Sequence, residues 1–289
     1  MSDIIELCLT IDADSHCMKA SQLLATQTDL PQARIKDAMQ KGAVWLVRGN
    51  GRKRLRRASK PLQPGDQLLL NYNARLLEQS VPAPHLIHDA QEYSIWFKPY
   101  GLYCQGSRWG DFASINRWVE VHLPELLGCP QRPVFIVHRL DRATTGLILL
   151  CHGKKSAQLF STLFREGGID KRYQAIVHGD FSTHPQNHEV NLDVDGKSAR
   201  SLFSHVEHRQ GYSLVDVTLV TGRKHQIRQH LSALGHPIAG DRLYGGHSVN
   251  AENRDLQLQS VSLEFVCPIS GTGQRFTVAD KQRLQLFPD

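Results

Sequence analysis

The chain has 289 residues, of which 40% are hydrophobic and 21% are charged. This length accommodates one large domain, or a large domain with a smaller one, and the composition excludes a largely disordered protein. No apolar run approaches the length of a membrane span, and the first residues, MSDIIELCLTIDAD, carry acids where a signal peptide has basic residues. We therefore expect a cytoplasmic protein that is not bound to a membrane. The six cysteines form no C-x-x-C pair, so neither a zinc site nor a disulfide scaffold is expected.

The excess positive charge is concentrated in one segment. The chain has 34 basic and 28 acidic residues, a balance of +6. The segment from Arg48 to Lys60 contains seven basic residues and no acidic one, which leaves 27 basic residues elsewhere. The seven are Arg48, Arg52, Lys53, Arg54, Arg56, Arg57 and Lys60. Such a cluster is typical of a phosphate-binding surface, and we expect these residues to bind a polyanion; the alternative is a solvated basic loop.

The elements around the basic segment predict a small domain over residues 1–75. QARIKDAMQKG (32–42) has the spacing of a short helix that stops at Gly42. AVWLVR (43–48) and QLLLNY (67–72) indicate strands, and Pro64, Gly65 and Asp66 form a turn before the second one. This order of elements resembles the small RNA-binding domain named after ribosomal protein S-four of the small subunit. A linker is expected over residues 76–88, where Pro82 and Pro84 interrupt any periodicity.

Residues 89–289 predict a second, larger domain. Strands are expected where apolar residues run together or alternate, in YSIWFK (93–98), VFIV (134–137), GLILLC (146–151), KRYQAIVHG (171–179) and SLVDVTLV (213–220). Helices are expected over DFASINRWVEVHLPELL (111–127), over 154–166, and from near Lys224 to Gly235. Strands outnumber helices without regular alternation, which predicts an α+β fold with a mixed, largely antiparallel sheet and helices packed on it.

The turn HRLDRATT (138–145) between two apolar strands carries the first candidate for chemistry. Asp141 lies between Arg139 and Arg142 in this turn. A nearby cation keeps a carboxylate ionised where burial alone would favour protonation. An ionised carboxylate in such a place suits a nucleophile or a general base. An ion pair that pins a hairpin explains the same spacing equally well.

A second cluster of charge lies at the start of the last predicted helix. Arg223, Lys224, His225, Arg228 and His230 follow one another within TGRKHQIRQH. Basic residues at a helix start oppose the helix dipole, so an anionic partner should compensate them. That partner is either a phosphate or Asp141.

Four strings in order along the chain resemble the signatures of the RluA-like branch of the RNA pseudouridine synthases. They are YSIWFKPYGL (93–102), HRLDRATTGLILL (138–150), KRYQAIVHG (171–179) and GRKHQIRQHLSALGHPIAGDRLYG (222–245). By this resemblance, Asp141 is the catalytic aspartate, Arg228 is its partner, and Tyr173 packs on the target base. Arg139 is then the arginine that fills the stack around the extruded uridine. The sequence departs from the family at Thr145, where serine is usual and the hydroxyl is kept.

The resemblance implies an isomerase that needs no cofactor, metal ion or second substrate. Uridine must be flipped out of its stack, at a cost of roughly a few kcal/mol. Stacking on an aromatic ring such as Tyr173 returns about 1 to 3 kcal/mol. Asp141 then attacks the sugar or the base, or removes a sugar proton; the sequence does not choose among these. Tyr173 is either a stacking platform or a base at the ring carbon in the last step.

The expected partner is RNA, and the enzyme is expected to act as a monomer without an obligate protein partner. Further phosphate contacts are expected at Lys98, Arg108, Lys171, Arg172 and Lys224, with plain surface charge as the alternative. An attached N-terminal RNA-binding module favours ribosomal RNA of the large subunit over transfer RNA. The competing interpretations are a non-catalytic RNA-binding or ribosome-assembly protein and an aspartate-dependent glycosidic hydrolase. The hydrolase normally needs a second acid, and none is identified in the matched strings.

Overall fold

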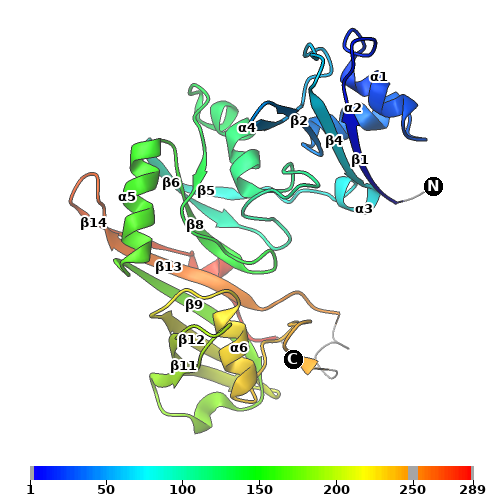
Figure 1. Cartoon of the computed structure of the whole chain (residues 1–289). Helices are drawn as coiled ribbons and strands as arrows, with labels where there is room; N and C mark the ends of the chain where they lie inside the picture. The colour runs from blue at the N-terminus through cyan, green and yellow to red at the C-terminus, as the bar shows by residue number, and fades with distance from the viewer. Residues whose placement is uncertain (1–2, 247–252, 288–289) are drawn as a thin grey trace. The chain divides into compact units, whose positions relative to one another are not determined.

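The computed structural model describes residues 3–246 and 253–287, which divide into two compact units (Figure 1). The N-terminal unit consists of Met1–Val81 and Gln105–His122. The C-terminal unit consists of Pro82–Cys104 and Leu123–Asp289. In the described part of the chain, no helix combines the length and the apolar character needed to cross a bilayer.

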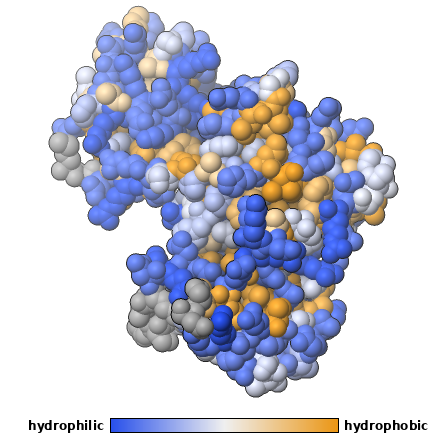
Figure 2. All heavy atoms as spheres, turned by 180° about the vertical axis from the view of Figure 1, so that it is seen from behind, coloured by the Kyte–Doolittle hydropathy of each residue, from blue (hydrophilic) through white to orange (hydrophobic). Residues whose placement is uncertain are grey.

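An antiparallel sheet of four strands forms the N-terminal unit, in the order β1-β4-β2-β3. The strands are β1 (Ile4–Thr10), β2 (Val44–Arg48), β3 (Gly51–Arg54) and β4 (Gln67–Asn73), and the helices are α1 (Ala20–Thr26), α2 (Gln32–Gln40) and α3 (Ala74–Leu77). Leu24, Ile35, Met39 and Leu68 are fully buried between helices and sheet. The expected helix and both expected strands are present. The face of this unit visible at the upper left of Figure 2 is mostly hydrophilic.

Part of the basic segment is a strand and not a loop. β3 (GRKR) pairs with β2 at the edge of the sheet. Charged side chains are common on edge strands, because they prevent further strands from adding there. The alternation of side chains along β3 places Arg52 and Arg54 on one face and Lys53 on the other.

The division of the chain differs from the expected linker at 76–88. That segment contains the end of α3 and most of β5 (His85–Asp89), which pairs with β6 (Tyr93–Lys98). Residues 105–122, expected in the second domain, belong to the N-terminal unit. There Phe112 packs against the apolar core, and the backbone N–H of Asp111 donates to the carbonyl of Lys41 over 3.1 Å. These contacts join residues about seventy positions apart, so local patterns in the sequence do not reveal them.

A ten-stranded sheet in the order β10-β11-β12-β9-β13-β8-β6-β5, joined by β7 and β14, forms the C-terminal unit. The further strands are β7 (Phe135–Ile136), β8 (Thr145–Cys151), β9 (Ile169–His178), β10 (His188–Asn191), β11 (Arg200–Arg209), β12 (Tyr212–Leu219), β13 (Leu258–Val266) and β14 (Gly273–Thr277). Only the β8–β13 pair among the described strands is parallel. The α+β fold with a largely antiparallel sheet is therefore confirmed.

The expected helices of the second half are present as α4 (Ile115–Leu127), α5 (Lys154–Arg165) and α6 (Gln226–Ala233). α5 buries Phe160 fully, and its ring lies 5.0 Å from that of Tyr93 on β6 and 5.5 Å from that of Phe265 on β13. This apolar packing fixes α5 to the sheet next to β8, whose first residues follow the turn that holds Asp141.

Candidate active site

Backbone contacts fix the turn that carries Asp141. The backbone N–H of Thr144 donates to the carbonyl of Asp141 over 3.1 Å, which closes the turn before β8. On the other side, the backbone of buried Leu140 makes two hydrogen bonds to the thiol of Cys104, of 3.1 and 3.2 Å. The Nε2 atom of His138 accepts from the N–H of Leu149 on β8 over 2.8 Å. Asp141 is thus presented by a backbone that is held at both ends.

Gly146 brings this turn next to the strand that carries Tyr173. Gly146 has a φ of +103°, and a Cβ atom added to it would lie 2.1 Å from the carbonyl oxygen of Ser260. Only glycine therefore allows β8 to run beside β13 at Ser260. Ser260 also pairs with Tyr173 on β9. The glycine that follows the RATT sequence is what puts Asp141 and Tyr173 on neighbouring parts of one sheet.

Each carboxylate oxygen of Asp141 faces a different basic residue. Nη1 of Arg228 donates to Oδ2 over 3.3 Å, and Nε2 of His225 lies 3.5 Å from Oδ1. Arg228 belongs to α6, and His225 immediately precedes it in the left-handed conformation, with a φ of +56°. The side chain of Asp141 is still 26% exposed. Of the two anionic partners expected for the basic cluster, the structure thus contains Asp141.

A second carboxylate, Asp241, holds Arg228 more tightly. Nε and Nη2 of Arg228 donate to its two oxygens over 2.8 and 2.7 Å. The Arg228 side chain is 6% exposed and that of Asp241 is fully buried. Burial disfavours the charged form of both residues. The pairing outweighs burial: Arg228 lowers the pKa of Asp241, and Asp241 raises the pKa of Arg228. Both residues are therefore charged, and the guanidinium has a fixed position beside Asp141.

Asp241 was missed from the sequence, although a signal was present. It is the single acidic residue in the otherwise basic string 222–245. An acid in such surroundings has cations to pair with, and buried acids are almost always paired. Its Oδ1 atom also accepts from the backbone N–H groups of Leu243 and Tyr244, over 3.0 and 3.1 Å. The carboxylate of Asp241 therefore positions both Arg228 and the turn that follows Asp241 itself.

The turn from Asp241 to Tyr244 also orients His225. The hydroxyl of Tyr244 lies 3.0 Å from Nδ1 of His225, while Nε2 faces Asp141. Burial lowers the pKa of His225, and the charge of Asp141 offsets this only in part. The imidazole is therefore mainly neutral at pH 7. The sequence places His225 in the basic cluster but does not reveal either of these contacts.

Tyr173 lies buried on β9, close enough to Asp141 for the two to interact electrostatically. Burial raises the pKa of its phenol, and the negative charge of Asp141 raises it further. The phenol is consequently protonated at neutral pH. Tyr173 therefore contributes a neutral aromatic ring to the site and not a phenolate.

Lys98 departs from the expected surface contact with phosphate. Its side chain is fully buried, and Nζ donates to the carbonyls of Pro99, Leu102 and Arg142 over 3.1, 2.9 and 3.2 Å. Burial lowers its pKa to about 8. With its three donors directed to backbone carbonyls, the ammonium cannot reach a phosphate. Its effect is to tie the turn after β6 to the residue that follows Asp141.

The other expected RNA contacts of the C-terminal unit are distributed over different surfaces. Arg139, Arg172 and Lys224 are exposed, and Lys171 is half-buried. Arg139 precedes Asp141 by two residues, and no hydrogen bond or ion pair ties its side chain to another described residue. Lys171 shares the face of β9 with Tyr173, whereas Arg172 lies on the opposite face. Arg139 thus lies two residues before Asp141, Lys224 adjoins His225, which faces Asp141, and Lys171 lies on the strand face of Tyr173. Arg172 lies on the other face of β9.

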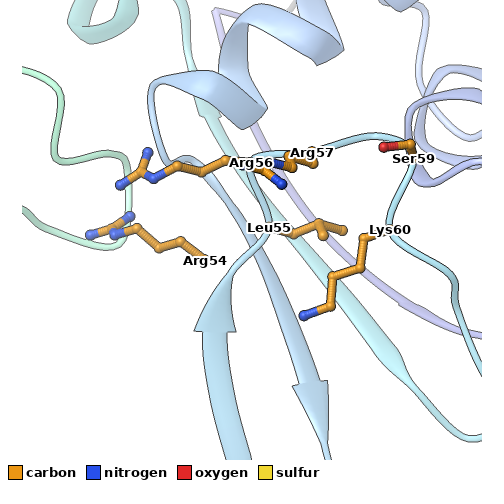
Figure 3. A pocket seen from close by; sticks show the side chains of 6 residues that line it. All are labelled: Arg54, Leu55, Arg56, Arg57, Ser59 and Lys60. Carbon is orange, nitrogen blue, oxygen red and sulfur yellow. The ribbon is translucent and has the colours of Figure 1, made fainter. Parts of the chain in front are cut away.

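The seven basic residues of the segment from Arg48 to Lys60 fall into two groups. Arg48 donates to both oxygens of buried Asp66 over 2.7 Å. Arg54 and Arg56 share the carboxylate of Asp111, at 3.0 and 2.5 Å. The remaining four, Arg52, Lys53, Arg57 and Lys60, are exposed, and among residues 3–246 and 253–287 none of them forms an ion pair with a carboxylate. Figure 3 shows Arg54 and Arg56 reaching toward the same side, while Arg57 and Lys60 point elsewhere.

Comparison with known proteins places this geometry in a family. The sequence model of a family described as RNA pseudouridylate synthase matches residues 92–233, which include Asp141, Tyr173 and Arg228. A protein of Bacillus subtilis (strain 168), named as an uncharacterized RNA pseudouridine synthase, is 31% identical over 232 residues, 74% of this chain and 80% of that protein. Ribosomal large subunit pseudouridine synthase C of Escherichia coli (strain K12) is 28% identical over 301 residues, 92% of this chain and 90% of that protein.

A solved structure of a pseudouridylate synthase domain protein has a similar fold. The human protein titled RNA pseudouridylate synthase domain containing 4 is similar with a TM-score of 0.56 and 22% identity, over 68% of this chain and 88% of that one. This likeness shows a shared fold. Together with the sequence relatives, it agrees with the ordered strings around Asp141, Tyr173 and Arg228. The chain belongs to the RNA pseudouridine synthase family, in its RluA-like branch, whose members are isomerases that act on RNA.

Proposed function

We propose that this protein converts uridine to pseudouridine in RNA of the large ribosomal subunit. The Escherichia coli relative, whose name states this substrate, is similar over 92% of this chain, so the similarity extends across both units. A ribosomal RNA substrate also suits the exposed cations of the N-terminal unit. It fits the cytoplasmic location expected from the sequence as well.

Asp141 is the residue that we assign to the reaction. The observation that carries this assignment is the way its carboxylate is held. It is partly exposed, yet one oxygen contacts Arg228 and the other faces His225, and buried Asp241 fixes Arg228 in turn. An ion pair that merely pinned a hairpin would not need a guanidinium locked from behind by a second carboxylate. A carboxylate that must meet a flipped uridine in one orientation does need it.

Tyr173 and Arg139 are assigned to the flipped state of the RNA. Extrusion of a uridine costs roughly a few kcal/mol, and packing against an aromatic ring returns about 1 to 3 kcal/mol. Because burial raises the pKa of Tyr173, we assign its ring to packing on the base and not to proton removal. Arg139 is exposed two residues before Asp141, and no hydrogen bond or ion pair to another described residue restrains its side chain, which suits an arginine that fills the vacated stack.

The two units have separate roles in this proposal. The N-terminal unit is an RNA-binding module similar to the domain of ribosomal protein S-four, and the C-terminal unit performs the chemistry. Asp141, Tyr173, Arg228 and Asp241 all lie in the C-terminal unit, and we propose that the enzyme acts as a monomer.

The test is a map of pseudouridines in total RNA from cells that lack this protein. The cells are complemented with wild type, with Asp141→Asn, or with Asp170→Asn, which alters an exposed carboxylate at the start of β9. We expect a site in large-subunit RNA to disappear on deletion and to return with wild type and Asp170→Asn only.

Restoration of the site by Asp141→Asn would overturn the assignment of this residue. A lost site in transfer RNA would correct the substrate. An unchanged map would favour the non-catalytic RNA-binding protein.

A further inference from the structure

A hollow in the N-terminal unit combines an indole with arginine side chains. It has a volume of about 320 Å³ and is lined by Trp45, Arg52, Arg54, Gly106, Ser107 and Arg108. That space is sufficient for one planar nucleobase. Aromatic rings and guanidinium groups are the side chains on which unpaired bases stack in RNA-binding proteins.

The pairing of β2 with β3 forms two walls of the hollow. Trp45 stands opposite Arg54, and Arg52 lies one strand position further on the same face. The central guanidinium carbons of Arg54 and Arg52 lie 4.1 and 4.5 Å from the centre of the indole ring. These distances are those of cation–π contacts. The indole and the two guanidinium groups therefore form one continuous layered surface.

The third wall comes from residues 106–108, which lie more than fifty positions later in the chain. The indole Nε1 donates to the carbonyl of Arg108 over 3.1 Å, and Nη2 of Arg54 donates to the carbonyl of Ser107 over 2.8 Å. Asp111 holds Arg54 through Nε at 3.0 Å. The walls at Trp45 and Arg54 are therefore fixed before any ligand arrives. Arg52 is exposed and, among the described residues, has no carboxylate as an ion-pair partner.

A second hollow adjoins the first at Arg54, which lines both. It has a volume of about 520 Å³ and is lined by Arg54, Leu55, Arg56, Arg57, Ser59 and Lys60 (Figure 3). Arg57 and Lys60 are the exposed cations of this lining, and Ser59 adds a hydroxyl. Cations and hydroxyl groups are the usual partners of phosphate oxygens in RNA.

We propose that the two adjoining hollows bind an unpaired nucleotide of the RNA substrate. The base enters the Trp45 hollow and stacks on the indole–guanidinium surface, and the neighbouring phosphates lie against Arg57 and Lys60. This proposal rests on the proposed function and adds to it that the N-terminal unit recognises a base, not only backbone charge. A base inside a duplex has no free face, so paired RNA reaches the phosphate hollow alone.

Binding of three RNA probes to the full chain tests this proposal by fluorescence anisotropy. The probes are a single strand of about 12 nucleotides, a duplex of the same sequence, and the same strand without bases. The variants are Trp45→Ala, Trp45→Phe and Arg52→Ala. Lys53→Ala is the matched control, because Lys53 neighbours Arg52 on β3 but lies on the other face, opposite Leu46.

Wild type is expected to prefer the single strand over the strand without bases. Trp45→Ala and Arg52→Ala should each weaken single-strand binding at least about fivefold, which is the lower end of the effect of one stacked base. Trp45→Ala should leave duplex binding unchanged, and Trp45→Phe should retain most of the affinity. Lys53→Ala should weaken the binding of all three probes alike and flatten the dependence of that binding on salt.

Three results would overturn the assignment, namely equal binding of the strand with and without bases, equal losses on single strand and duplex, or an Arg52→Ala effect no larger than that of Lys53→Ala. Trp45→Phe and Arg52→Ala keep the test valid if Trp45→Ala does not fold. The pseudouridine map is read independently. If pseudouridine still forms but any of these three results is found, the proposed nucleotide site is refuted and the proposed enzymatic function stands.

Discussion

Replacing Asp241 by asparagine tests the idea that Arg228 acts on Asp141 only because it is held from behind. Asparagine has nearly the same shape, but one of its two terminal atoms is a hydrogen-bond donor. It can accept only one of the two hydrogen bonds that Arg228 gives to Asp241, of 2.8 and 2.7 Å. The guanidinium is then buried with Asp141, at 3.3 Å, as its remaining carboxylate contact among the described residues.

Two effects of this change can be estimated. Breaking a buried ion pair costs about 3 to 5 kcal/mol. Because asparagine still accepts from the turn N–H groups of Leu243 and Tyr244, we expect the lower end, about 3 kcal/mol. For a unit of this size that loss lowers Tm by about 6 to 12 °C. In addition, Arg228 is drawn into a closer pair with Asp141, so we expect kcat to fall at least about tenfold, or about 1.4 kcal/mol in activation free energy.

The measurements are urea unfolding and the rate of pseudouridine formation on RNA from the deletion strain, with kcat and KM determined separately. Asp66→Asn is the matched control. Asp66 is also a buried acid that accepts from both ends of an arginine, here Arg48 at 2.7 Å, but it lies in the N-terminal unit. It should lower stability and leave kcat unchanged. A destabilised Asp241→Asn enzyme with normal kcat would show that the pair is purely structural.

Three further predictions concern single groups of the same site. His138 has its pKa lowered by burial from 6.5 to about 3, so the folded state binds fewer protons than the unfolded one below pH 6.5. Stability from this group is present above pH 6.5 and lost as the pH falls toward 3. Between pH 7.5 and 4.5 this loss of stability amounts to at most about 2.7 kcal/mol. The His138→Gln variant should lack this part of the pH dependence of the free energy of unfolding, measured in urea. Curves of unfolding free energy against pH that run parallel for wild type and variant would contradict this. Lys98→Met should lower kcat by loosening the turn beside Asp141, with KM for RNA and its salt dependence unchanged; a raised KM and a flatter salt dependence would restore the phosphate role. Tyr173→Phe should retain most of kcat, whereas a loss of more than a hundredfold would indicate that the hydroxyl takes part in proton transfer.

The parts of the site that could be predicted from the sequence are those carried by short strings. A charged turn between two apolar strands marks Asp141 as a candidate, and basic residues at a helix start predict an anionic partner for the cluster that includes Arg228. The choice of Arg228 from this cluster comes from the family resemblance. Both signals are local, since they depend on neighbours within about ten residues. The alternation along KRYQAIVHG likewise placed Tyr173 on a strand, as β9 has it. Local patterns therefore predict Asp141 as one of two possible partners of the basic cluster.

The parts that could not be predicted depend on contacts between distant positions. The sequence predicts an exposed Lys98 because this lysine ends an apolar strand and precedes a proline. Its burial depends on carbonyls at Leu102 and Arg142 that turn toward it only in the folded chain. Asp111 meets Arg54 and Arg56 across more than fifty residues. No periodicity reports such a pairing, because a lone acid in a loop has no pattern of its own.

Asp66 and Asp111 change what the basic segment means for RNA binding. Counted from the sequence, seven cations predict a slope of log affinity against log salt of about −5 on single-stranded RNA, at about −0.7 per phosphate neutralised. In the structure, these two carboxylates engage Arg48, Arg54 and Arg56, so only four exposed cations of this segment lack an ion-pair partner among the described residues. The segment then contributes a slope of about −3. The three paired arginines act on the protein itself, since Arg48 holds the turn at Asp66, and Arg54 and Arg56 hold residues 106–111 beside Trp45. Part of the charge therefore builds the surface on which the remaining part binds RNA.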